Sequence, residues 1–189
     1  MGVWVRGMSV QFENFQQIAA RAIVGTLIGV LLYTITKKIN IAKIIHISRK
    51  DFLFILARSI VLLIGIGLFT FAINVGNYSN INMIYAIPSS AILGVIILKE
   101  KLTPVKLFAL FLGFIGVVMI TVKNFSNLSS IGIGELAAFI STFFYSLSFI
   151  ARKYISKSLN NEEIAILGSL IMGVLALIVS LLLGNDPAN

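Results

Sequence analysis

The sequence predicts an all-α polytopic membrane protein with six transmembrane helices. Of its 189 residues, 58% are hydrophobic and 12% are charged, whereas a soluble domain carries about 25% charged residues. The mean hydropathy is +1.01. The apolar residues form continuous runs of helix length instead of the alternating pattern that is typical of barrel strands. These observations exclude a soluble globular protein.

Six apolar runs approach the length of about 20 residues that crosses a bilayer core. In chain order they are Gln17–Thr36, Phe52–Ile73, Met83–Leu98, Pro104–Val122, Glu135–Ala151 and Ile164–Leu183. The loops between them are short, so we expect no separate water-soluble domain. The opening Met1–Val10 shows no long charged leader and no small-residue cleavage site, and it therefore predicts no removable signal peptide.

The positions of the basic residues predict the orientation, because basic residues in short loops are retained on the cytoplasmic side. Only Arg6 and Lys123 lie in the loops of one side. The loops after the first, third and fifth runs, with the residues beside them, hold Lys37, Lys38, Lys43, Arg49, Lys50, Lys99, Lys101, Lys106, Arg152, Lys153 and Lys157. We therefore expect a protein of the cytoplasmic membrane, with the amino terminus of this chain outside. The net charge of +8 is placed in loops, so we expect no nucleic-acid partner.

A weak internal repeat accompanies this alternation. Shifting the chain by 146 positions places Gln17-Ile18-Ala19 on Glu163-Ile164-Ala165 without a gap. The matched segments have opposite predicted orientations, as an inverted repeat requires. On this interpretation Gly2–Arg6 is the tail of a helix that begins before Met1 and whose counterpart is the fifth run.

Several short motifs resemble those of EamA-type carriers of the drug/metabolite transporter superfamily. They are Ala86-Ile87-Pro88, Leu98–Thr103 and Gly113–Val118, similar to the close of the first repeat, and Gly134–Ala138 with Tyr145 and Arg152-Lys153, similar to the opening of the second. The resemblance implies a ten-helix carrier of two inverted repeats that moves small metabolites or drugs. It implies that residues 1–125 are a first repeat lacking most of its first helix and that residues 126–189 are the first two helices of a second, so that the chain is truncated.

The third run is a candidate lining of a substrate path. It has sixteen residues and contains Pro88, whose missing N–H leaves the carbonyl of Ile84 without its helical partner. Freed backbone groups at membrane depth are tolerated where they face protein or a wet cavity. Tyr85 and Ser89, beside the proline, are therefore predicted to bind substrate. The alternative is a packing kink whose free groups are satisfied by the hydroxyls of Ser89 and Ser90.

The fifth run has a polar face. Ser141, Tyr145 and Ser148 are three to four residues apart, so that they lie on one side of a helix. We take Ser141 and Tyr145 as candidate substrate-binding residues. The same spacing also fits ordinary hydrogen bonding between helices.

Small residues predict close helix contacts. Ala109, Gly113 and Gly116 follow one another at i, i+4 and i+7, and Gly25 with Gly29 forms a G-x-x-x-G pair. Such spacing allows helix backbones to approach closely in lipid.

Two arginines lie inside apolar runs. Arg21 and Arg58 are near enough to the helix ends for their side chains to extend toward the headgroups. Arg58 is the deeper of the two, and an anionic substrate or a helix-end carbonyl could pair with it. No Asp or Glu occupies the middle of a run, so we expect no proton relay through a buried carboxylate.

The function predicted from these features is a membrane carrier, or a fragment of one, that moves small molecules by alternating access. The alternative is a small membrane interaction module that oligomerises without transport. An enzyme is not expected, because the chain has no G-x-S-x-G motif and its one histidine, His46, lies in a loop. With no cysteine and no metal-ligand cluster, we expect no cofactor or metal. The expected partners are the lipid bilayer, a small-molecule substrate, and the missing helices or a second copy.

Overall fold

The computed structural model describes residues 13–36, 44, 46–99, 101, 103–121, 132–155 and 159–183. The expected helix tail at residues 2–6 lies outside these ranges. Within them the regular elements are helices, namely α2 (Asn14–Ile35), α4 (Arg49–Val75), α5 (Tyr78–Ala86), α6 (Ser89–Leu98), α7 (Pro104–Thr121), α8 (Ile133–Ala151), the 3₁₀ turn η2 (Arg152–Tyr154) and α9 (Asn161–Leu182).

The all-α membrane class is confirmed. Five helical segments of the described chain are long and apolar enough to cross a membrane, with the broken pair α5 and α6 counted as one segment, Tyr78–Leu98. The sixth expected span is α7, which has 18 residues and a shorter apolar stretch, Pro104–Gly116.

The third span begins earlier than the sequence predicts. We expected it to start at Met83, but α5 begins at Tyr78, so that the broken span is 21 residues long and not unusually short. The side chain of Asn77 caps α5 by accepting a hydrogen bond from Ser79 N at 3.0 Å. The cap and the surrounding packing stabilise this helix. From the sequence alone, the polar residues of the segment, such as the buried Asn80, suggest a loop.

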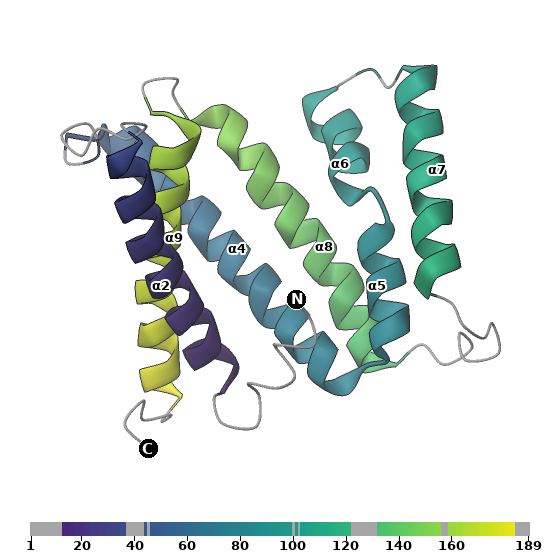
Figure 1. The fold of residues 1–189 in the computed structure, drawn as a ribbon, viewed down its shortest axis with the longest axis horizontal. Coiled ribbons are helices and arrows are strands. Elements are labelled where there is room, and N and C mark those ends of the chain that lie inside the picture. The colour runs from purple at the N-terminus through teal and green to yellow at the C-terminus, as the bar shows by residue number, and fades with distance from the viewer. Residues whose placement is uncertain are drawn as a thin grey trace.

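Helix α8 lies at the centre of the arrangement (Figure 1). It packs along α4 on one side and against α5 and α6 on the other. The antiparallel helices α2 and α9 pack together at one edge, next to α4, while α7 stands at the opposite edge beside α5. Because α8 has neighbours on both sides, its side chains decide much of what the interior contains.

Small residues set the spacing of α2 and α9. A Cβ added to Gly173 would lie 3.2 Å from the Cβ of Ala22, and one added to Gly29 would lie 3.6 Å from Cγ1 of Ile166. The close contact expected of the Gly25 and Gly29 pair is thus present at Gly29, whereas no described atom lies within 4 Å of a Cβ added to Gly25. On α7 the expectation is not met, because no described atom lies within 4 Å of a Cβ added to Gly113 or Gly116.

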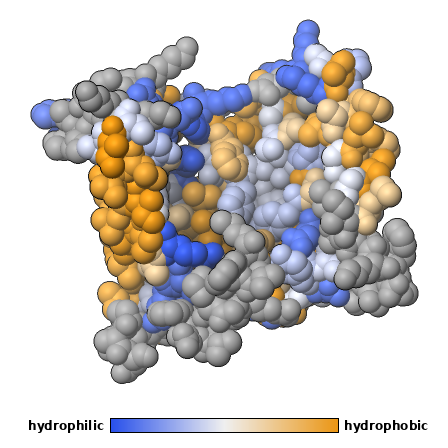
Figure 2. All heavy atoms as spheres, in the orientation of Figure 1, coloured by the Kyte–Doolittle hydropathy of each residue, from blue (hydrophilic) through white to orange (hydrophobic). Residues whose placement is uncertain are grey.

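The surface of the described helices is apolar, and the interior holds buried hydroxyl groups as well as an apolar core. Leu27, Leu31 and Phe108 are 62–66% exposed, whereas Ser141 and Ser148 are fully buried. Figure 2 shows apolar residues over α2 and α7, and polar residues in a hollow between them. This distribution suits a protein surrounded by lipid, in which apolar side chains lose nothing by facing outward.

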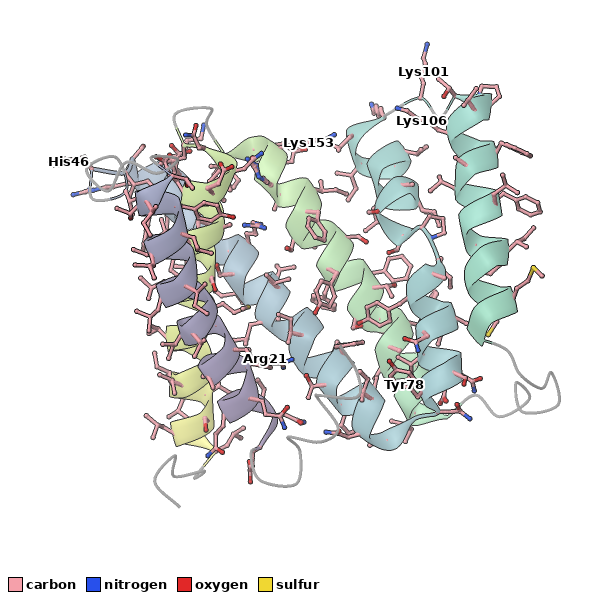
Figure 3. All side chains as sticks on the ribbon, in the orientation of Figure 1. Arg21, His46, Tyr78, Lys101, Lys106 and Lys153 are labelled. Atoms are coloured by element: carbon pink, nitrogen blue, oxygen red, sulfur yellow. The ribbon has the colours of Figure 1, made fainter. Side chains whose placement is uncertain are left out.

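The basic residues gather at one end of the helices. Figure 3 shows Lys101, Lys106 and Lys153 at the same end as His46, and Tyr78 toward the opposite end. These lysines belong to loops and helix ends that are far apart in the sequence. The fold therefore gathers the described basic loop residues on one side, as the alternation of the runs predicts.

Candidate functional site

The inner side of α8 is lined with hydroxyl side chains. Ser141, Thr142, Ser146 and Ser148 are all buried, and the half-buried Tyr145 lies among them. We call these five residues the α8 polar face. Part of their hydrogen-bonding capacity is used within the helix, since Ser141 Oγ donates to Ala138 O and Ser146 Oγ to Thr142 O. Ser141 and Ser146 also form hydrogen bonds with Tyr85 of α5 and Ser89 of α6.

Tyr85 of α5 joins the α8 polar face through its hydroxyl, which is hydrogen-bonded to the hydroxyl of Ser141. Its ring meets that of Tyr145 edge-on, with centroids 6.1 Å apart, and that of Phe69 at 4.7 Å. Gly65 of α4 allows this packing, because a Cβ there would lie 3.4 Å from the backbone nitrogen of Tyr145. Three predicted site residues, Tyr85, Ser141 and Tyr145, are thus in one cluster.

Pro88 separates α5 from α6, as predicted. The carbonyl of Ile84 does not stay unpaired, however, because it accepts a hydrogen bond from Ile87 N at 3.1 Å. Ser89 N bonds to Ile87 O at 2.7 Å instead of reaching back one full turn. The carbonyl freed by the proline is therefore satisfied by a tighter turn, and the chain changes direction before α6 begins.

Ser89 follows the break and points at α8. Its hydroxyl lies 2.7 Å from Ser146 Oγ and donates to Thr142 O at 3.3 Å. The next residue, Ser90, is exposed. Neither Thr142 nor Ser146 was predicted as a site residue, although their spacing of four places them on one side of a helix, one position beyond Ser141 and Tyr145.

Arg58 reaches from α4 to the last turn of α8. Its Nε donates to Ser148 O at 3.1 Å, and its Nη1 lies 3.5 Å from the position of a Cβ on Gly168 of α9. Carbonyls in the last turn of a helix lack helical partners and attract cations. Of the two partners that the sequence allows for Arg58, the helix-end carbonyl is the one present.

Arg21 keeps to its own helix. Its Nε donates to Gln17 O, one turn nearer the amino end of α2, at 3.2 Å. The guanidinium is also within electrostatic reach of Tyr145. Figure 3 shows Arg21 on the side of α2 that faces the other helices.

A second polar cluster lies at the start of α8, and sequence analysis missed its role. The carboxylate of Glu135 accepts hydrogen bonds from Asn77 N at 2.9 Å, Gly132 N at 3.0 Å and Asn80 Nδ2 at 3.4 Å. It ties the α4–α5 corner to the first turn of α8 and is 5% exposed. Glu135 is the third residue of α8, a position at which a glutamate commonly caps the start of a helix. This position could have indicated its role from the sequence.

Two clefts open beside α7. One, of about 420 Å³, is lined by Asn80, Met83, Ile84, Ile87, Phe114, Glu135, Leu136 and Phe139. The other, of about 340 Å³, is lined by Ile87, Pro88, Ala91, Ile92, Leu107, Leu110, Phe111 and Phe114. Apart from Asn80 and Glu135 these residues are apolar, so both clefts suit a hydrocarbon chain or another helix better than a polar solute.

The acidic residues that the structure describes lie at helix ends. They are Glu13, Asp51, Glu135, Glu162 and Glu163. Within the same part of the chain, no group of three His, Asp or Glu side chains is placed to hold a metal ion.

Five of the six predicted site residues meet at α8. Ser141 and Tyr145 belong to it, and Tyr85, Ser89 and Arg58 each bond to it from a neighbouring helix, with Pro88 as the break that precedes Ser89. The arrangement offers hydroxyls, two aromatic rings and a guanidinium, but no base beside a nucleophile. Hydroxyls and a guanidinium can form hydrogen bonds with a polar ligand.

Comparison with known proteins identifies the family of the chain. No curated protein and no solved structure matches the chain. A family model, described as the EamA-like transporter family, matches residues 1–122, which is more than half of the sequence. The chain therefore belongs to the EamA-like transporter family, a family of membrane transporters of the drug/metabolite transporter superfamily.

Proposed function

We propose that the α8 polar face and its partners line the path of a small-molecule substrate, and that the carrier works by alternating access. Tyr85, Pro88, Ser89, Ser141, Tyr145 and Arg58 are the residues that we propose to contact the substrate. The observation that carries this proposal is the gathering of buried hydroxyls and a guanidinium inside helices whose outer surfaces are apolar. Polar groups at membrane depth are costly, and they commonly mark a substrate pathway.

The broken span supports the same assignment. Discontinuous helices often flank the substrate site of a transporter because their ends offer unpaired backbone groups. The break at Pro88 lies directly before the contact between Ser89 and Ser146.

We propose an orientation in the cytoplasmic membrane with the basic end inside. Lys101, Lys106 and Lys153 share that end, and the positive-inside rule then places Tyr78 and the start of α2 outside. The amino terminus of this chain is outside in the same scheme.

We further propose that residues 1–125 and 126–189 belong to two inverted repeats of a ten-helix carrier. The antiparallel helices α2 and α9 are both 22 residues long. Their bounds are related by a shift of 147, one more than the 146 of the sequence match. The family match ends at residue 122, near the proposed boundary. Helices of the second repeat, or a second copy, are the proposed partners of the α7 face around Gly113 and Gly116.

Cysteine accessibility tests whether the α8 polar face lines an aqueous path. Because the chain has no natural cysteine, a thiol reagent can label each single variant only at the introduced cysteine. Tyr145→Cys and Tyr85→Cys should react with a charged, membrane-impermeant thiol reagent in sealed vesicles. Leu27→Cys, on the exposed face of α2, should not react because it faces lipid. If the two tyrosine positions are as unreactive as position 27, the face is dry and the proposal fails.

A further inference from the structure

The charges within the spans suggest what kind of substrate the path accepts. Arg58 is the tenth residue of α4 and Arg21 the eighth of α2, whereas the described acidic residues lie at helix ends. Neither arginine has an ion pair with a carboxylate among the described residues. Both act near the same stretch of α8, because Arg58 bonds to Ser148 O and Arg21 lies within electrostatic reach of Tyr145.

Arg58 is held in a way that leaves donors available. Only Nε is used for Ser148 O, and the two terminal nitrogens have no hydrogen-bond partner among the described residues. Gly168 leaves space beside Nη1. The hydroxyl of Ser148 is buried and also has no partner in the part of the chain that the structure describes. A guanidinium fixed at one nitrogen presents its remaining N–H groups in a defined plane, which suits a carboxylate or a phosphate.

Other positive groups surround this position. Arg152 of η2 is close enough to Arg58 for the two cations to repel each other, and an anion between them would relieve that repulsion. The amino end of α6, a helix of ten residues, lies beside Ser146 of the same face and carries partial positive charge. Arg152 and the amino end of α6 are therefore positive groups near Arg58, whereas the carboxylates of the same end, Asp51, Glu162 and Glu163, lie in the first turns of α4 and α9.

We propose that the carrier's substrate bears an anionic group that binds Arg58 at the inner end of the α8 polar face. The inference rests on the proposed function and specifies its substrate class. The body of the substrate then lies along Tyr145 and Tyr85, whose rings and hydroxyls accept an aromatic or hydroxylated skeleton. Arg21 contributes by attraction at longer range.

Three probes that share one skeleton and differ in charge test the proposal. Phenylacetate is an anion, phenylacetamide is neutral and phenethylamine is a cation at neutral pH. Binding of each is measured by equilibrium dialysis against the purified full chain in nanodiscs of zwitterionic phosphatidylcholine. We expect phenylacetate to bind at least about tenfold more tightly than the other two, since a hydrogen-bonded ion pair with Arg58 is formed by the anion alone.

Substitutions at position 58 connect the preference to the arginine. Arg58→Gln should abolish the preference for the anion, while Arg58→Lys should retain most of it because the charge remains. Lys106→Gln removes an exposed cation at the same end and should leave the preference unchanged. If Arg58→Gln does not fold, Arg58→Lys and Arg21→Gln still test the proposal. In each of these variants we expect the preference for phenylacetate to be reduced but detectable.

The outcomes separate this inference from the proposed function. Equal binding of the three probes, or tighter binding of the amide or amine, overturns the anionic substrate while the aqueous path can still be shown by cysteine labelling. Absence of binding by all three also overturns it. Repeating the measurement with phosphatidylglycerol in the nanodiscs distinguishes a headgroup site, because an anionic lipid that displaces phenylacetate completely would mean that Arg58 binds lipid instead of substrate.

Discussion

Gly76 and Gly134 meet backbone to backbone where the α4–α5 corner packs on the first turn of α8. A Cβ added to Gly134 would lie 2.5 Å from both Cα and N of Gly76, and one added to Gly76 would lie 3.2 Å from Cα of Gly134. The carboxylate of Glu135 bonds across the same junction to Asn77 N. The carboxyl end of α4 and the amino ends of α5 and α8 are therefore fixed relative to one another at a point where no side chain can be added.

This contact predicts a large effect for a small substitution. Gly134→Ala should destabilise the protein by about 1–3 kcal/mol, because the added methyl group meets rigid backbone and not a side chain that can move. For a chain of this size such a loss lowers the melting temperature by several degrees, roughly 2–4 °C per kcal/mol. Thermal unfolding in detergent measures it.

Gly113→Ala is the matched control, because a Cβ there has open space around it. It should be neutral or stabilising by up to about 1 kcal/mol, since alanine favours helix more than glycine does. Equal effects of the two alanine substitutions would contradict the close contact at Gly134.

The contact between Ser89 and α8 predicts different effects for two adjacent serines. Ser89→Ala should destabilise the protein by about 0.6–1.7 kcal/mol, because hydrogen bonds between helices in lipid have about this strength and the contact of Ser89 with Ser146 and Thr142 would be lost. Ser90→Ala should have little effect, since Ser90 is exposed. Chemical or thermal unfolding of the two variants side by side decides the matter, and a greater loss at Ser90 would show that α6 is rotated from the position described above.

Pro88→Leu tests the role of the break. Leucine restores a backbone N–H and allows α5 and α6 to join, which would turn Ser89 away from Ser146. We expect transport by the reconstituted carrier to fall sharply while the amount of protein in the membrane fraction is unchanged, because leucine is at least as favourable as proline in lipid. Unchanged transport kinetics would favour a packing kink with no part in the path.

Labelling from the two sides of the membrane tests the orientation. Lys101→Cys, at the basic end, should react with an impermeant thiol reagent only from the cytoplasmic side, and Ser79→Cys, at the opposite end, only from outside. Both positions are exposed, so failure to react cannot be attributed to burial. Labelling of position 101 from outside in intact cells would reverse the proposed topology.

Local sequence determined the helices and the position of the break. Long apolar runs have no stable alternative to helix in lipid, since each backbone N–H and C=O must be satisfied within the segment. Pro88 cannot donate to such a helix, and the chain breaks there. The spacing of Ser141, Tyr145 and Ser148 likewise follows from helix geometry, so their common face could be predicted without knowing what covers it.

Only the tertiary structure decided which groups meet across the helices. The partners of Arg58, Tyr85 and Ser89 are 53 to 90 residues away in the sequence, and no local pattern specifies such distances. The start of α5 at Tyr78 has the same origin, because a polar segment becomes helical where the buried carboxylate of Glu135 binds its cap and Asn80. Apolar runs specify that helices form in lipid, whereas the pairing of their polar groups depends on the rotation and packing of each helix, which exist only once the chain is assembled.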